Sequence, residues 1–133
     1  FLLPKLDVRF NMAWTDAEIV DNAPDPVIVG NVFPRMPKWR GNLLATYHMT
    51  DRWDIGGSLQ YASDSYGRLD NSDKADQVFG GQDRYLFLGL KTSFRWDKHL
   101  AFGLGMDNVT DETAYVAHPW PARTLYFNVS YDW

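Results

Sequence analysis

Apolar and polar residues alternate strictly along most of this chain. The clearest case is the segment 124–133, in which apolar side chains occupy every second position from Leu125 to Trp133. Successive side chains of a β-strand point to opposite faces, so this period of two predicts a strand with one apolar face. The same pattern recurs at about 6–14, 39–49, 53–62, 85–96 and 100–107. Helical spacing is not evident, and the sequence predicts an all-β chain of about six antiparallel strands.

The connections between these segments are alternately short and long. Thr50-Asp51-Arg52 and Asp97-Lys98-His99 are short enough for tight hairpin turns. The other connections, at about 16–38, 63–84 and 108–123, are long and rich in Gly, Pro, Asn and Asp. In an antiparallel meander this order places all tight turns at one edge and all long loops at the other. Outer-membrane β-barrels have this asymmetry, with short periplasmic turns and long extracellular loops.

The distribution of aromatic side chains also favours a membrane barrel. The mean hydropathy is −0.38 and no run of 18 apolar residues exists, which excludes a transmembrane helix but not a membrane strand, whose alternating hydropathy averages out. On the apolar faces the aromatic rings lie at both ends of the predicted strands. Membrane proteins place Trp and Tyr in this way, at the two membrane–water interfaces. The predicted girdle consists of Trp14, Trp39, Trp53, Tyr61, Trp96 and Tyr131. Two alternatives remain open here: a soluble ligand-binding β-barrel, and a self-contained small outer-membrane barrel acting as an adhesin or a lipid-modifying enzyme.

Composition and residue spacing exclude several kinds of function. The net charge of −4 argues against nucleic-acid binding, and the absence of cysteine removes thiolate metal sites and cysteine nucleophiles. His48, His99 and His118 are too scattered to suggest a metal site or a catalytic pair, and we expect His99 to be solvated. An acidic loop with Asp70, Asn71, Asp73 and Asp76 lacks EF-hand spacing, so we expect it to be solvated rather than to bind Ca²⁺. We therefore expect no enzyme activity, no metal site and no cofactor.

Several motifs resemble those of TonB-dependent outer-membrane transporters. Gly105-Met-Asp-Asn-Val-Thr-Asp111, followed by Ala114-Tyr115, resembles the family's segment before the last strand. His118-Pro-Trp-Pro-Ala-Arg-Thr124 is similar to the entry into the final strand, and Gly30-Asn-Val-Phe-Pro-Arg-Met-Pro37 to a loop that leads into an earlier strand. Asp70-Asn-Ser-Asp73 with Phe79-Gly-Gly81 resembles an extracellular loop of one branch of the family.

The resemblance implies a specific place for the chain in a larger protein. Family members combine an N-terminal plug with a 22-stranded barrel, and about six strands match only the C-terminal portion. We therefore expect residues 1–133 to form the closing strands of such a barrel in the outer membrane of a Gram-negative bacterium. The plug and the TonB box are absent from this sequence, which begins at Phe1 without an initiator Met, as expected of a fragment or of a chain that has lost a leader.

The resemblance also implies a function and its partners. The parent protein would be an active importer of a scarce ligand, most often a ferric siderophore or another metal chelate in this family. Its partners would be the TonB–ExbB–ExbD complex, reached through the plug, the barrel-assembly machinery, outer-membrane lipid and lipopolysaccharide. No catalytic step is implied.

Three sets of residues are the candidate functional positions. The predicted ligand contacts in the extracellular loops are His118, Trp120, Arg68, Tyr66 and Arg35. The predicted lumen or plug-facing residues are Arg9, Arg40, His48, Gln60, Lys91 and Arg95. The predicted assembly signal consists of Phe127, Val129, Tyr131 and Trp133. Basic loop residues could attract an anionic ligand, but for Arg123 we expect a structural pairing with an acidic neighbour.

Overall fold

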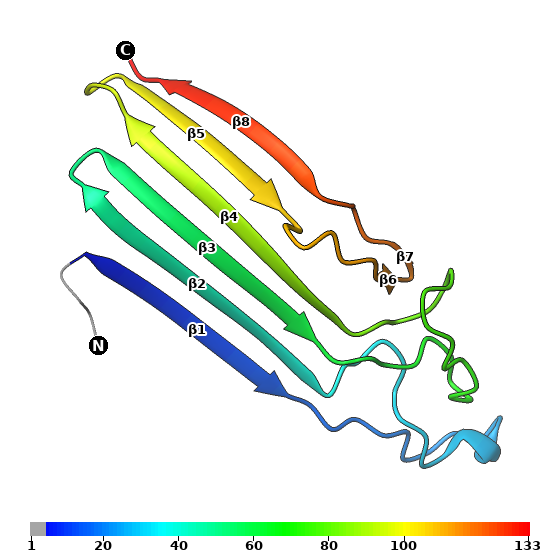
Figure 1. Ribbon diagram of the computed structural model, residues 1–133. Helices are drawn as coiled ribbons and strands as arrows, with labels where there is room; N and C mark the ends of the chain where they lie inside the picture. The colour runs from blue at the N-terminus through cyan, green and yellow to red at the C-terminus, as the bar shows by residue number, and fades with distance from the viewer. Residues whose placement is uncertain (1–4) are drawn as a thin grey trace.

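The computed structural model describes residues 5–133 as one antiparallel sheet with long loops along one edge (Figure 1). The six strands lie in the order β1-β2-β3-β4-β5-β8. Their order in the sheet is therefore the same as their order along the chain. Their bounds are β1 Leu6–Trp14, β2 Trp39–Thr50, β3 Trp53–Ala62, β4 Tyr85–Arg95, β5 Leu100–Asp107 and β8 Thr124–Tyr131. These bounds confirm the all-β prediction.

Small elements decorate the long loops. A two-stranded hairpin, β6 (Tyr115–Val116) with β7 (His118–Pro119), lies within the last loop, and a 3-10 helix, η1 (Pro26–Ile28), lies within the first. Neither element was predicted from the sequence, because both are too short to show a period. Within residues 5–133, no helix is long and apolar enough to cross a membrane.

The tight turns lie at one end of the strands and the long loops at the other end, as predicted (Figure 1). We call these two sides of the sheet the turn edge and the loop edge. The β2–β3 and β4–β5 connections are tight turns, and the loops 15–38, 63–84 and 108–123 extend from the other edge. In the second turn the Asp97 carboxylate accepts hydrogen bonds from the backbone N–H groups of His99 and Leu100, at 2.7 and 2.9 Å. These bonds lower the pKa of Asp97 and hold the turn closed.

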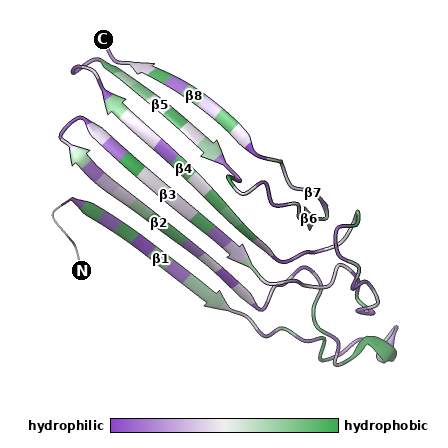
Figure 2. Ribbon diagram, viewed as in Figure 1, coloured by the Kyte–Doolittle hydropathy of each residue, from purple (hydrophilic) through white to green (hydrophobic). Residues whose placement is uncertain are grey.

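The strand register places the apolar residues on one face across the whole sheet. Phe10 lies opposite Leu43, and Leu43 lies opposite Leu59, which in turn pairs with Leu88. Because side chains of directly paired residues point to the same side, these pairs form continuous rows. Figure 2 shows the resulting alternation of hydrophobic and hydrophilic residues along each strand. We call the two sides the apolar face and the polar face.

The apolar face is exposed rather than packed into a core. Phe10, Leu125 and Phe127 each expose about two thirds of their surface, at 67%, 64% and 65%. The buried hydrophobic residues of the described chain instead lie in the loops or toward the loop edge: Ile19, Ile28, Ala62, Phe87 and Ala114. In the described chain this face is therefore a large exposed apolar surface that extends over several strands.

Aromatic side chains lie at both ends of the apolar face. At the loop edge Trp14 packs against Trp39, with ring centroids 6.4 Å apart. At the turn edge Phe94 and Trp96 meet edge to face at 6.3 Å, and Trp53 donates its indole N–H to Thr92 Oγ1 at 2.7 Å. The girdle residues named above are all exposed, as an interfacial position requires.

The last strand ends before the last residue. The alternation predicted a strand up to Trp133, but β8 ends at Tyr131, and Trp133 is fully exposed beyond it. The backbone pairing nevertheless continues for one more contact, because the Asp132 N–H donates to the His99 carbonyl oxygen at 2.9 Å. The side chain of His99 also contacts this segment, with Nδ1 2.7 Å from the Asp132 carbonyl oxygen. The expectation that His99 is merely solvated is therefore wrong.

Candidate functional site: the polar face and the loop edge

The polar face carries charged side chains at several positions along the strands. Arg9 on β1 lies opposite Leu44 on β2, and Arg40 lies opposite Ala13 and Ala62. Lys91 on β4 pairs with Gly56 and Gly105, which have no side chains of their own. Among residues 5–133, Arg9, Arg40 and Lys91 form no salt bridge. This face therefore presents unpaired positive charge alongside its carboxylates.

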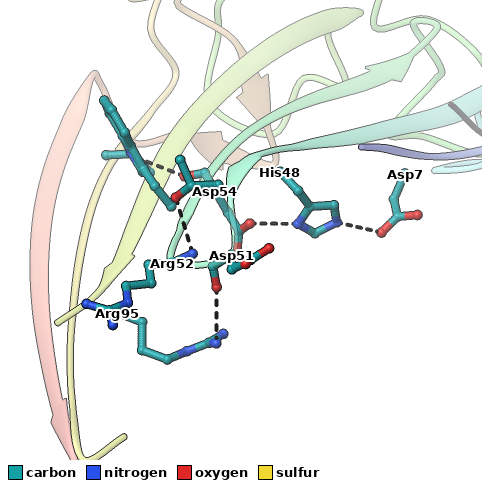
Figure 3. A network of polar contacts seen from close by, with 9 residues as sticks. Asp7, His48, Asp51, Arg52, Asp54 and Arg95 are labelled. Atoms are coloured by element: carbon teal, nitrogen blue, oxygen red, sulfur yellow. Dashed lines mark hydrogen bonds and ion pairs between the residues drawn. The ribbon is translucent and has the colours of Figure 1, made fainter. Parts of the chain in front are cut away.

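At the turn edge of this face His48 lies between two carboxylates. Its Nδ1 is 2.6 Å from Asp54 Oδ1, and its Nε2 is 3.0 Å from Asp7 Oδ2 (Figure 3). The three residues come from β2, β3 and β1, respectively, so one ring joins three strands. Because the contacts use opposite sides of the ring, the two carboxylates have no common point at which to share a metal ion with His48.

The arginines of this edge bind backbone oxygens of the turns. Arg95 donates to the Asp51 carbonyl oxygen, and Arg52 to the Trp96 carbonyl oxygen, both at 3.4 Å (Figure 3). Each arginine thereby links one tight turn to the strand end of the neighbouring hairpin. Arg95, predicted to face a plug, is thus used in part to hold the turn edge together.

The loops at the opposite edge are tied to one another by polar side chains. Asn71 accepts a hydrogen bond from the Val32 N–H at 2.8 Å and donates to the Val32 carbonyl oxygen at 2.9 Å. The buried Asp83 carboxylate accepts from the backbone N–H groups of Gln77 and Tyr115, the latter at 2.7 Å. These contacts join the loop 63–84 to the other two long loops.

The last loop is organised by the buried side chain of Asn108. Its amide nitrogen donates to the carbonyl oxygens of Glu112 and Pro121, and its Oδ1 accepts from the Glu112 N–H at 2.9 Å. Further along, Asp111 accepts from the Arg123 N–H at 2.8 Å and forms a 3.9 Å salt bridge with its guanidinium group. The expected structural pairing of Arg123 is therefore confirmed.

Trp120 from this loop packs on two aromatic residues of β4. Its ring lies 5.1 Å from that of Phe87 and 5.9 Å from that of Tyr85, and all three rings are nearly parallel. Beside the stack is a hollow of about 400 Å³, which we call the Trp120 hollow; its lining includes Ser58, Gln60, Phe87, Asp107, Trp120 and Thr124. Ring faces beside hydroxyl and amide groups suit a ligand with both planar and polar parts.

A second hollow lies between the first two long loops. It measures about 570 Å³, and its lining includes Lys38, Asp64, Tyr66, Asp73, Lys74 and Asp83. We call it the Tyr66 hollow. Lys74 Nζ lies 5.3 Å from the centre of the Tyr66 ring, and a hydrogen bond to this tyrosine raises the pKa of Lys74. Lys38 is paired with Asp16 at 3.6 Å, so part of the basic charge of these loops is already neutralised.

The predicted ligand contacts are divided among different places. Trp120 and Tyr66 line separate hollows, and His118 lies 5.9 Å from the Phe79 ring instead. Arg35, from the first long loop, donates its backbone N–H to the Tyr66 carbonyl oxygen, and Arg68, within the loop 63–84, donates its backbone N–H to Asp73. The five residues thus belong to one loop edge but not to one cavity.

The acidic loop uses its carboxylates to bind its own backbone. Asp73 accepts from the Gly67 N–H at 2.9 Å, and Asp70 accepts from Ser72, which lowers the pKa of Asp70. In the described part of the chain, no three carboxylate or histidine side chains come together as metal ligands. These residues therefore shape the loop rather than converge on a common centre.

Sequence reasoning missed three groups in this region. Tyr85 and Phe87 are large rings on the polar face of β4, and that unusual placement was a signal for the stack. The His48–Asp54 pairing depends on a register shift between His48 and Thr50, because the turn alone, with Thr50 opposite Trp53, would set His48 opposite Ile55. Asp83 and Asn108 gave no signal, because their backbone partners are fixed only by the folded loops.

Comparison with known proteins places this architecture. Residues 3–109 match the family model described as TonB dependent receptor-like, beta-barrel. No curated protein matches the chain.

Several solved structures share the fold. The siderophore receptor PiuA from Acinetobacter baumannii is 17% identical over 98% of this chain, with a TM-score of 0.79. The ferric citrate transporter FecA, unliganded, is 20% identical over 96% of this chain, with a TM-score of 0.80. The ferric-catecholate import receptor Fiu from K12 E. coli is 20% identical over 98%, with a TM-score of 0.78.

The chain corresponds to only part of each of these structures. It spans 20% of PiuA, 21% of FecA and 19% of Fiu, which is about a fifth of their length. The match to the family model covers most of the chain and includes five of the six sheet strands. The chain belongs to the TonB-dependent receptor-like β-barrel family.

Proposed function

We propose that residues 1–133 form the C-terminal part of an outer-membrane receptor that imports a metal chelate with energy supplied through TonB. The family match is the observation that carries this proposal, because the family consists of outer-membrane receptor barrels of Gram-negative bacteria. The structures that share the fold include siderophore, ferric citrate and ferric-catecholate receptors, which supports a ferric chelate as the ligand class.

The exposed apolar face supports a position in a bilayer. Its aliphatic middle would contact lipid chains, and its girdle residues would lie at the two interfaces. The polar face would then line the lumen, with Arg9, Arg40, His48, Gln60, Lys91 and Arg95 directed toward a plug. Lipopolysaccharide would contact the outer leaflet end of the same apolar face.

Ligand contact is proposed at the loop edge. The Trp120 and Tyr66 hollows offer ring faces together with polar groups, and His118, Arg35 and Arg68 lie in the same set of loops. The parent protein would bind the chelate there and release it when TonB, driven by ExbB and ExbD, moves the plug. The segment itself would supply closing strands, loops and the signal for the barrel-assembly machinery, without a catalytic step or a cofactor.

An uptake experiment tests the proposal. Cells that depend on the full-length receptor for iron would be given radioactive ferric citrate, a ferric catecholate and a ferric hydroxamate, one at a time. We expect TonB-dependent uptake of at least one chelate, and at least a several-fold loss of that uptake in Trp120→Ala. Trp14→Phe, at the loop edge of the apolar face, is the control and should retain uptake. If none of the three chelates is taken up in a TonB-dependent manner, the proposal is contradicted.

A further inference from the structure

We propose that Asp7, His48 and Asp54 form a proton-operated bridge across β1, β2 and β3 at the turn edge of the polar face. The bridge is complete only while the His48 ring carries a proton on both nitrogens. When the bridge opens, β1 would be held less firmly to β2, and this part of the barrel wall formed by the sheet would carry more negative charge. This inference concerns the stability of the wall and does not depend on which ligand the receptor carries.

The positions of the three residues follow from the strand register. His48 and Asp54 are direct partners on β2 and β3, across the tight turn 51–52. Asp7 on β1 lies opposite Thr46, two positions along β2 from His48, and therefore reaches the ring diagonally. Backbone pairing thus fixes all three side chains on the same face before any side-chain contact forms.

The chemistry of the contacts sets the dependence on the proton. An ionised carboxylate only accepts hydrogen bonds, and a neutral imidazole has a single N–H to donate. With both ring nitrogens within 3.0 Å of a carboxylate oxygen, the neutral ring satisfies one of its two partners. The protonated ring donates to both, and these charge-assisted bonds are stronger than neutral ones.

Other charged groups near the ring do not replace this arrangement. Beyond Asp54, β4 contributes Ser93 opposite it and then Arg95, whose guanidinium donates to the Asp51 carbonyl oxygen. On the β1 side, the neighbouring charged residues are Arg9, two positions from Asp7, and Lys5, whose carbonyl oxygen accepts from the His48 N–H at 2.7 Å. Within the described chain, the salt-bridge partners of His48 are Asp7 and Asp54.

The location makes loss of the bridge consequential. The His48 side chain is 42% exposed, so its proton exchanges with solvent. Of the two contacts, the one to Asp7 is longer, and it ties β1 to β2 through a side chain. Deprotonation changes the formal charge of the three side chains from −1 to −2. We therefore expect the turn edge of β1 to open more often at high pH.

Hydrogen exchange measured by mass spectrometry tests the proposal on the full-length receptor in detergent micelles. Exchange would be followed from about pH 5 to about pH 9, which covers the range in which histidine rings titrate. Rates are divided by the intrinsic chemical rate at each pH. We expect protection of amides in 6–10 and 46–50 to fall several-fold as the pH rises, while protection in β5 and β8 stays constant.

Variants separate the bridge from a general effect of pH. His48→Gln and Asp7→Asn should each remove the pH dependence from β1, whereas His99→Gln should keep it, because His99 contacts a backbone oxygen rather than two carboxylates. An unchanged pH dependence in His48→Gln would overturn the proposal. If that variant does not assemble, the wild-type profile decides: a constant β1 profile, or an equal fall in β1 and β8, would also overturn it.

Discussion

The ring of Tyr126 on β8 covers the backbone of Gly105, its direct partner on β5. A Cβ atom placed at residue 105 would overlap this ring. The aromatic side chain therefore shields a strand position that has no side chain of its own, as aromatic residues do beside glycines in other sheets. The pair lies on the polar face next to Lys91, and the Lys91 and Tyr126 residues line a hollow of about 120 Å³.

This pairing predicts that Gly105→Ala is destabilising. The added methyl group must push the Tyr126 ring aside, and overpacking of this kind costs about 1–3 kcal/mol. Gly57→Ala is the matched control, because its Cβ would meet Leu90 Cδ2 at an ordinary 3.7 Å. The free energy of unfolding in urea, measured in micelles, gives the comparison. Adding Tyr126→Ala to Gly105→Ala should recover part of the loss, and failure to recover any of it would contradict this explanation.

An arginine on the apolar face should be costly at mid-sheet. Leu104 lies between Thr92 and Phe127 in the register and is exposed on that face. In a bilayer, Leu104→Arg should lower the free energy of unfolding by about 2–4 kcal/mol. Thr46→Arg, on the polar face, should cost much less. Equal effects of the two changes in lipid vesicles would mean that the apolar face does not meet lipid.

Asn108 should hold the last loop through its three hydrogen bonds. Asn108→Ala leaves the carbonyl oxygens of Glu112 and Pro121 and the Glu112 N–H without this partner, and each buried group left unsatisfied costs about 1–3 kcal/mol. We expect faster hydrogen exchange in 109–123 and increased cleavage of this loop by protease. Asn108→Asp keeps the acceptor but sets a buried carboxylate against two carbonyl oxygens, so its effect should be at least as large. Wild-type exchange in Asn108→Ala would argue against this role.

The turn at Asp97 should lose stability in acid. Its pKa is lowered in the folded chain, so its contribution is present above the ordinary value of 3.8 and disappears as the pH falls through the lowered value. The difference in Tm between wild type and Asp97→Ala should therefore be larger at neutral pH than in strong acid. Asp97→Asn should keep its advantage over Asp97→Ala in acid, because an amide oxygen accepts hydrogen bonds without ionising. If the difference in Tm between wild type and Asp97→Ala is the same at neutral pH and in strong acid, this account is contradicted.

Removal of Trp133 should impair assembly in cells while leaving the sheet contacts intact. The side chain is fully exposed and lies beyond the last strand residue, so its loss removes little packing. If Phe127, Val129, Tyr131 and Trp133 act as an assembly signal, the deletion should reduce surface display of the full-length receptor several-fold, with little change in Tm of the refolded protein. Normal display would contradict the predicted signal.

Residue periodicity was sufficient to predict the sheet but not the loop contacts. The strands from β1 to β5 could be located because alternation and tight turns together determine which residues face each other, as for Phe94 and Phe102. The stacking of Trp120 on Phe87 could not be predicted, since it depends on the path of a long loop. The same holds for the contact between Asp83 and the backbone N–H of Tyr115, which lies in a different loop.

The regular alternation of tight turns and long loops has a consequence for how such walls can change during evolution. The repeating unit of the sheet consists of two strands, the tight turn that joins them and one long loop. Duplication of that unit leaves every loop on its original side. A wall of this kind can therefore widen or narrow by two strands at a time, whereas gain of a single strand would exchange the environments of all subsequent loops. Even strand numbers follow from this constraint.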